Sequence, residues 1–354
     1  MDNLKYRIKG VEIDTPTLTS NLDELNIPVT RKSVPRLKDE LINFSLPIGK
    51  HQCRWMFHCS LKEQSILCSG GVTKTFFGHN AWVFKKEIVQ IEAIIKIIAA
   101  DLKSIGGIVL PDSMDAIAIE RTEITRHHAL NDSIDKREAL ERLNAMFMAK
   151  FPNRHFYNGA THDRAGTTGI GLNKNSRVCR AYDPFDKFKE KPIHVSEEIW
   201  NLLRAECANH LRIELIFDKR ELQSADLSTV AAWANTSLID EQVVKRYEDY
   251  GLSSEFKTKV LQPDLVISTN PAFVEAARFF FTGGARGKQI NSRSGTSNRF
   301  KQYMTAKGYC VDVAFSHHIH LAHGLHRILQ PQLAAELPDE LRSAPDLFNF
   351  WWQE

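Results

Sequence analysis

Two short stretches, DAIAIERTEIT at residues 115–125 and LRIELIF at residues 211–217, set the architecture expected of this chain. Apolar and polar residues alternate in the first stretch, which predicts a β-strand. At a period of two, one face of that strand carries Ile117, Ile119, Arg121 and Glu123. The second stretch also predicts a strand. Both contain the triplet Arg-x-Glu, as Arg121-Thr122-Glu123 and Arg212-Ile213-Glu214, so each strand presents an Arg and a Glu on one face.

Helical and strand patterns alternate on either side of these two stretches. Apolar spacing predicts helices over 85–104, 131–151 and 195–207, and strands over 4–13, 54–60, 65–68, 73–77, 156–161, 167–172 and 178–182. Residues 14–50 are expected to be loop with short helical pieces. The order predicts an α+β fold, with an antiparallel-rich sheet and helices on one face, of ferredoxin-like or palm type. Two domains are expected: residues 1–222, which hold the sheet, and residues 223–354, which are mainly helical.

Composition restricts the class of protein. The 354 residues carry 46 Lys+Arg and 43 Asp+Glu, so a nucleic-acid surface has to come from local clustering. No apolar run reaches the ~18 residues of a membrane span. The six cysteines form no CxxC pair, which favours reduced thiols, and the first residues lack an apolar signal core. We therefore expect a cytoplasmic protein that does not enter a membrane.

The repeated Arg-x-Glu triplet is a candidate metal and phosphate site. If the two strands are neighbours, Glu123 and Glu214 converge on one patch. Carboxylates on rigid strands suit Mg²⁺ or Mn²⁺, and Arg121 and Arg212 suit phosphate. Spacing alone favours the alternative, which is two exposed cross-strand salt bridges.

Tyr182 is a candidate nucleophile, because it ends a predicted strand among cations that favour a phenolate. Those cations are Arg177, Arg180, Lys187, Lys189 and Lys191, and the first three are also candidate DNA contacts. The alternative is a core or rim tyrosine that hydrogen-bonds through its hydroxyl. His79, in the turn Gly78-His79-Asn80 before the first long helix, is a candidate metal ligand, with a cap or surface role as the alternative.

The region from Arg278 to Lys307 has seven basic residues and no acidic ones. Phe300 and Tyr303 lie among the charges, a combination typical of nucleic-acid binding, although a solvated basic loop fits equally well. Five of the seven are candidate DNA contacts: Arg286, Lys288, Arg293, Arg299 and Lys301. Further on, His317, His318 and His320 lie in a helical pattern, in which residues two apart diverge, so no metal role is expected of them.

Taken in order, these features resemble the replication initiators of filamentous phages, the gene II/X family, and in particular those of Vibrio CTX-type phages. The similarity runs from about Gly78 to Phe217, with a weaker echo at Arg299-Phe300-x-x-Tyr303 and Gly308-Tyr309. The chain departs from the family at two positions. Relatives often carry Asp at the position of Glu123. They also tend to have a lysine two residues after the tyrosine, whereas here the first lysine after Tyr182 is Lys187.

The resemblance implies a tyrosine nickase that opens one strand of the origin DNA, starts rolling-circle replication and later rejoins the ends. Tyr182 would be the nucleophile that forms a 5′-phosphotyrosine, and Glu123, Glu214 and His79 would hold Mg²⁺ or Mn²⁺. The implied partners are origin DNA, a host helicase and a host polymerase in a bacterial cytoplasm, and a homo-oligomer on the DNA stays open. Whether Tyr157 or Tyr303 takes part also stays open. The alternatives are a hydrolytic metallonuclease and a non-catalytic origin-binding regulator.

Overall fold

A computed structural model describes most of the predicted sheet and its helices. The described residues are 2–34, 39–49, 51–78, 87–130, 136–151, 155–158, 167–173, 176–185, 195–253, 299–300, 302–303 and 325–335. The strands are β1 (Asn3–Lys9), β2 (Glu12–Ile13), β3 (Thr30–Val34), β4 (Asp39–Ile48), β5 (Cys53–Ser60), β6 (Ser65–Gly71), β7 (Ile108–Val109), β8 (Ile117–Ala129), β9 (His155–Asn158), β10 (Thr167–Asn173), β11 (Ser176–Tyr182) and β12 (His210–Asp218). The helices are α1 (Thr15–Glu24), α2 (Val72–Phe77), α3 (Glu87–Ile105), α4 (Lys136–Lys150), α5 (Glu197–Cys207), α6 (Lys219–Ser224), α7 (Thr236–Tyr250) and α11 (Leu325–Ile328).

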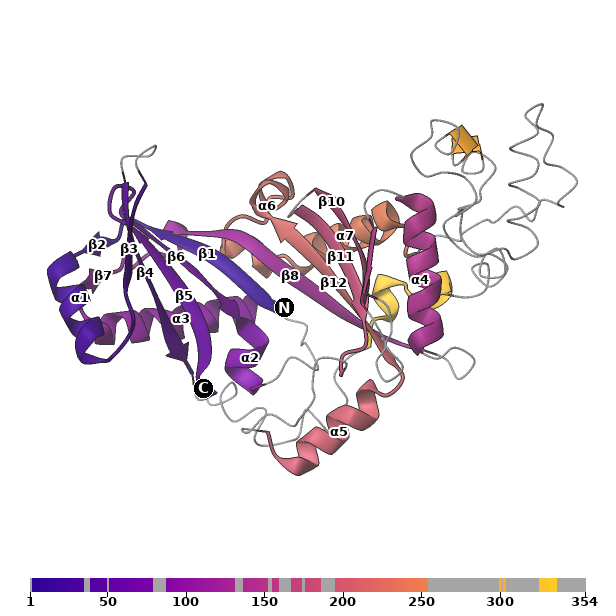
Figure 1. The fold of residues 1–354 in the computed structure, drawn as a ribbon, viewed down its shortest axis with the longest axis horizontal. Coiled ribbons are helices and arrows are strands. Elements are labelled where there is room, and N and C mark those ends of the chain that lie inside the picture. The colour runs from indigo at the N-terminus through magenta and orange to yellow at the C-terminus, as the bar shows by residue number, and fades with distance from the viewer. Residues whose placement is uncertain are drawn as a thin grey trace, which may run out of the picture.

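Ten strands form one antiparallel sheet in the order β3-β4-β5-β6-β1-β8-β12-β11-β10-β9 (Figure 1). The short strands β2 and β7 pair separately. The predicted α+β class with an antiparallel-rich sheet is confirmed. None of the described helices is long and apolar enough to cross a membrane.

The same connectivity occurs twice in this sheet. A first strand leads through a helix to the far edge, and four strands return until the last pairs antiparallel with the first. In the first unit these elements are β1, α1 and β3–β6, followed by α2 and α3. In the second they are β8, α4 and β9–β12, followed by α6 and α7, with α5 inserted before β12. The units meet where β1 pairs antiparallel with β8, so the centre of the sheet belongs to both.

One face of the sheet, which we call the core face, is mainly apolar and is covered by helices. In β1 this face carries the buried side chains of Leu4, Tyr6 and Ile8. The pairing of β1 with β6 and with β8 extends the same face over both units. Three side chains of this face contact three helices. Arg126 Nη1 donates to Glu87 Oε1 of α3 at 2.8 Å, Thr168 Oγ1 donates to Asn144 of α4 at 3.4 Å, and His128 Nε2 lies 2.7 Å from the Tyr247 hydroxyl of α7. This arrangement confirms the prediction that helices lie on one face.

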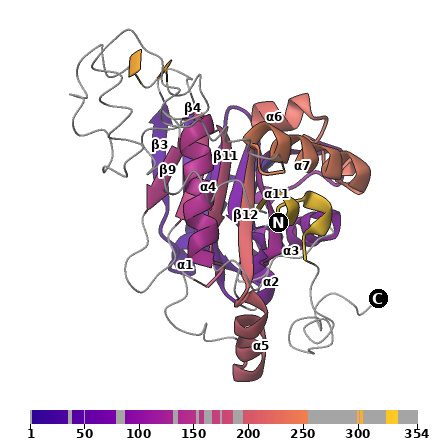
Figure 2. The same ribbon diagram turned by 90° about the vertical axis from the view of Figure 1, so that its right-hand side faces the viewer.

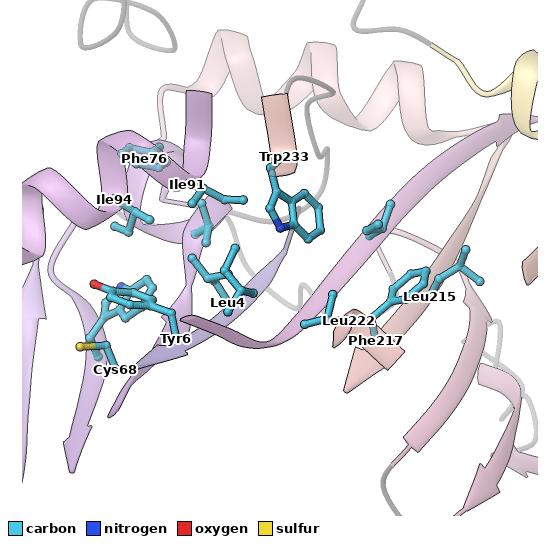
Figure 3. Packing of buried hydrophobic residues seen from close by; sticks show 14 of the residues in the cluster. Leu4, Tyr6, Cys68, Phe76, Ile91, Ile94, Leu215, Phe217, Leu222 and Trp233 are labelled. Carbon is cyan, nitrogen blue, oxygen red and sulfur yellow. The ribbon is translucent and has the colours of Figure 1, made fainter. Parts of the chain in front are cut away.

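The chain after the sheet packs into the core of the first unit. Trp233 follows α6 and is fully buried, and its indole donates to the Leu227 carbonyl at 2.9 Å. Figure 3 shows its ring close to Ile91 of α3 and Leu4 of β1. The segment that contains α11 lies against α7 (Figure 2). The predicted domain boundary after residue 222 stays a prediction.

A β-bulge corrects the predicted faces of β8. The register against β1 shifts, so that Lys5 pairs with Arg121 whereas Tyr6 pairs with Ile119, and Glu120 is the extra residue. Neighbouring residues of a strand point to opposite faces. Ile117 and Ile119 therefore lie on the core face, and Arg121 and Glu123 lie on the opposite face, which we call the outer face. The prediction of one shared face for all four was wrong.

Two other local predictions were wrong. Residues 73–77, expected to be a strand from their Thr and Phe content, form helix α2, which ends at Gly78 with a left-handed φ of 72°. Residues 14–50, expected to be loop with short helical pieces, do contain the short helix α1, but they also form the strands β3 and β4, which were not predicted. In β4 every second residue from Ile42 to Ile48 is buried, so this strand shows the alternation that a half-buried strand requires.

Candidate functional site

Three buried carboxylates meet on the outer face, and we call them the acidic cluster: Asp2, Glu123 and Glu214. One carboxylate oxygen from each lies within 4.8 Å of the others. Their exposed fractions are only 5%, 5% and 1%. Buried charges of one sign require compensation, so the surroundings of this cluster determine what it can do.

Strand register brings the cluster together. In the pairing of β8 with β12, Glu123 lies opposite Ile216 and Glu214 lies opposite Thr125, so the two glutamates are diagonal neighbours on one face. Asp2 comes just before β1. Its backbone N–H donates to the Glu123 carbonyl at 3.1 Å, and its carbonyl accepts from Val72 N–H at 2.8 Å. All three carboxylates therefore sit on rigid backbone at the junction of the two units.

Arg212 is the fully buried cation of the site. Its Nη2 donates to Asp2 Oδ2 at 2.8 Å and to Glu214 Oε1 at 2.9 Å. Burial by itself lowers the pKa of Arg212, but Tyr182 and the carboxylates raise it overall. The guanidinium is thus a permanent positive charge that ties β12 to the chain ahead of β1.

Tyr182 lies at the end of β11, directly opposite Arg212 in the register. Its hydroxyl donates to Glu214 Oε1, and its ring lies 5.3 Å from the Arg212 guanidinium carbon. The side chain is 1% exposed. Burial raises the pKa of the Tyr182 phenol well above 10, and Glu214 adds to the rise although Arg212 opposes it. The phenol is therefore neutral at neutral pH, with a carboxylate in place to accept its proton.

Glu123 is held by the side chain of Asn3, whose Nδ2 donates to Glu123 Oε2. Burial and, second, the charge of Glu214 raise the pKa of Glu123. At the edge of the site, Arg121 lies 3.9 Å from Glu123 and Arg180 lies 3.9 Å from Glu214. The side chains of these two arginines are 37% and 36% exposed, so they connect the buried cluster with solvent.

Thr125 and His127 line the outer face beside the cluster. Thr125 is 3% exposed, and its hydroxyl makes no hydrogen bond with any described group. His127 lies opposite Arg212 in the register. Burial, followed by the charge of Arg212, holds the pKa of His127 well below its usual range, so the ring is neutral.

The donors of the acidic cluster are all carboxylate oxygens, the type of ligand that a small divalent cation prefers. Arg212 is the fully buried cation among the three carboxylates, and the partly exposed Arg121 and Arg180 lie 3.9 Å from Glu123 and Glu214. Two opposite ligands of Mg²⁺ are about 4.2 Å apart, because each lies about 2.1 Å from the ion. The 4.8 Å limit of the cluster is close to that span. The Thr125 hydroxyl, opposite Glu214 in the register of β8 and β12, is one more hard oxygen on this face, of the kind that Mg²⁺ and Mn²⁺ prefer.

The structure brings together six of the predicted site residues: Tyr182, Glu123, Glu214, Arg212, Arg180 and Arg121. Arg180 and Arg121 lie at the solvent edge of the site. Arg177 belongs to β11 and Tyr157 to β9, but their side chains lie outside the described residues. Arg299 is exposed and Tyr303 is partly buried. The other predicted residues lie outside the described ranges: His79, Lys187, Arg286, Lys288, Arg293, Lys301, His317, His318 and His320.

Asp2 was missed by sequence reasoning, and so were its neighbours Asn3 and Thr125. The sequence shows a weak strand pattern after Asp2, but nothing in it indicates that this strand pairs with β8. Thr125 ends the stretch DAIAIERTEIT on the face of Glu123, so the period of two could have identified it.

The chain matches no protein-family model, no curated protein and no solved structure. The resemblance to phage replication initiators therefore stays a prediction based on the motifs.

Proposed function

We propose that this protein is a metal-dependent DNA nicking and joining enzyme that opens one strand of a phage or plasmid origin. One observation carries the proposal: a tyrosine hydroxyl hydrogen-bonds to a buried carboxylate within a cluster that fits Mg²⁺ or Mn²⁺. A nucleophile, its proton acceptor, hard-oxygen metal ligands and phosphate-binding arginines are the groups that phosphodiester transfer through tyrosine requires. In this proposal, the partners are origin DNA and the host helicase and polymerase that act after nicking.

The chain's own residues would act as follows. The Tyr182 oxygen attacks phosphorus while Glu214 Oε1 accepts the phenolic proton, and Arg212 holds the carboxylate in place. The bond from phosphorus to the 3′ oxygen breaks. This step leaves a 5′-phosphotyrosine and a 3′ hydroxyl, which takes its proton from solvent. Attack by that hydroxyl on the phosphotyrosine reverses the step and rejoins the strand.

Asp2, Glu123 and Glu214 would hold the divalent ion, which when bound supplies positive charge that offsets the phosphate charge and favours the phenolate. Arg180 and Arg121 extend from the cluster to solvent and would grip the phosphates on either side of the broken bond.

A second function, hydrolytic cleavage by a metallonuclease, is favoured by the burial of Tyr182. Because Tyr182 is only 1% exposed, its side chain must become accessible before the hydroxyl can reach a phosphate of DNA. Water bound at the carboxylates needs no such change. In that case no covalent protein–DNA product forms.

Labelled single-stranded oligonucleotides of randomised sequence, incubated with Mn²⁺, distinguish these functions on a denaturing gel. Transfer to Tyr182 predicts that a 3′-end label travels with the protein whereas a 5′-end label is released. Tyr182→Phe should abolish the labelled band, and Tyr250→Phe, which alters another buried tyrosine in α7, should retain it. Cleavage without a labelled band supports hydrolysis. Salt-sensitive binding without cleavage supports the origin-binding regulator.

A further inference from the structure

The outer face continues beyond the acidic cluster over the first unit, where it is open. Strand register places one row of side chains across five strands: Arg121 on β8, Lys5 on β1, Ser69 on β6, Met56 on β5 and Ser45 on β4. Neighbouring strands are spaced about 4.8 Å apart, so this row runs about 19 Å away from the cluster. Met56 is 51% exposed, and the other four are partly exposed.

This open row is cationic. Lys5 lies within it beside Arg121, whose guanidinium is 3.9 Å from Glu123, and Arg54, two residues before Met56 on the same face of β5, is exposed and donates to Ser45 Oγ at 2.8 Å. None of the five side chains in the row is acidic. Arg7, which lies one position further along β1 on this face, is neutralised by Glu120 and Glu63 at 2.8 and 3.2 Å. His58 also lies on this face of β5. Its pKa is lowered first by burial and then by the positive charges of Lys5 and Arg7.

Small serines, Ser69 and Ser45, flank the exposed Met56 in the row. Cations beside an exposed apolar side chain suit a flexible polyanion that offers both phosphates and base faces. Single-stranded nucleic acid has this chemistry, since its unpaired bases are free to contact the surface. A duplex offers phosphates but keeps its bases stacked inside.

We propose that Arg121, Lys5, Ser69, Met56 and Arg54 form a track that carries single-stranded DNA to and from the acidic cluster. The inference rests on the proposed function, because it takes the strand held at Tyr182 as the occupant. The first unit would thus serve as the strand-binding half of the enzyme, and the second unit would supply the reacting groups.

Salt-dependent binding of a fluorescent single-stranded oligonucleotide, measured by anisotropy without metal, tests the track. Each phosphate contact contributes about 0.7 to the slope of log K against log salt for single strands. The double variant Lys5→Ala/Arg54→Ala should lower that slope by about 1.4. The matched control is Lys96→Ala/Lys103→Ala, which removes two exposed charges from α3 on the other side of the sheet. An unchanged slope in the Lys5/Arg54 variant overturns the proposal.

A charge-insertion pair gives a second readout. Met56→Glu places an anion in the track and should weaken single-strand binding at least tenfold at low salt, whereas Val89→Glu, a comparably exposed position on α3, should leave it unchanged. Equal effects of the two substitutions, or a loss confined to duplex binding, would contradict the single-strand track.

The covalent gel assay distinguishes a failure of the proposed track from a failure of the proposed nicking function. A Tyr182-dependent band with no change in the salt slope refutes the track and leaves the nicking function in place. A lower slope with no covalent band supports the strand-binding surface and refutes the tyrosine nickase.

Discussion

The two units of the sheet share one connectivity but carry opposite chemistry on the outer face. Their strands can be aligned where β6 runs into α2, at Gly71–Val72, and where β12 runs into α6, at Asp218–Lys219. By register, Lys5 then takes the position of Glu123, and Leu67 takes that of Glu214. Ser60 takes the position of Tyr182, and Ser65 that of Arg212.

The shared order of strands and helices therefore does not by itself produce the acidic cluster. In the second unit, the outer face buries carboxylates, a guanidinium and a phenol that compensate one another. In the first unit, the same positions hold a lysine, a leucine and two hydroxyls, and the face is partly open. The Asp2 carboxylate, contributed by the chain just before β1, links the first unit to the chemistry of the second.

We expect Glu214→Leu to have the largest effect on activity and stability. It gives the second unit the residue type that the first unit has at the corresponding position, Leu67. This change removes the acceptor of the Tyr182 proton and one partner of buried Arg212. Covalent DNA attachment should be lost, and the free energy of unfolding in urea should fall by about 3–5 kcal/mol, as for other broken buried pairs. The control is Leu67→Ala at the corresponding position of the first unit. Unchanged stability and activity in Glu214→Leu would show that the cluster is incidental.

Trp233→Ala tests whether the two units form one cooperative body. The indole belongs to the chain that follows the second unit's sheet but packs beside Ile91 and Leu4 of the first. Its removal should cost about 3–5 kcal/mol while urea unfolding keeps a single transition. Ala in place of Leu333, which is 58% exposed, should cost far less. Two separate transitions in the wild type would mean that the units unfold independently.

The ion pair of Glu87 with Arg126 joins the units on the core face and makes stability depend on pH. Burial raises the pKa of Glu87, but the charge of Arg126, its hydrogen bond to the carboxylate and smaller contributions together lower the pKa below its usual 4.5. The contribution of the pair is therefore complete above pH 4.5 and is lost as the pH falls through the lower folded-state value. Glu87→Gln should cost about 3 kcal/mol at pH 7 and progressively less below pH 4.5. Urea unfolding at pH 7 and at a pH below 4.5 measures this cost. An equal cost at the two pH values would contradict the prediction.

Mn²⁺ should stabilise the protein through the acidic cluster alone. At a metal concentration of 100 times Kd, the gain in the free energy of unfolding is about 2.7 kcal/mol. A rise in Tm with Mn²⁺ should be present in the wild type and in Leu67→Ala and absent in Glu214→Leu. An equal rise in all three would place the metal elsewhere in the chain.

The sequence predicted those parts of the fold that depend on local periodicity. The alternation in β8 and β12 and the helical spacing in α3 and α5 correspond to real elements, whereas the pairing of β8 with β12, on which the convergence of the two Arg-x-Glu triplets depends, was only a condition of the prediction. The bulge at Glu120 could not be predicted, because it follows from the pairing of β8 with β1 rather than from any local pattern. Asp2 was missed for the same reason, since its place in the cluster depends on contacts with residues more than a hundred positions away.

The most direct test of the central claim is to locate the bond between protein and DNA. The covalent product formed with Mn²⁺ and a single-stranded oligonucleotide can be digested with protease and nuclease, and the modified peptide identified by mass spectrometry. The account predicts a nucleotide attached to Tyr182 and to no other tyrosine. Attachment at Tyr157 or Tyr303, or cleavage of the DNA with no modified peptide, would contradict it.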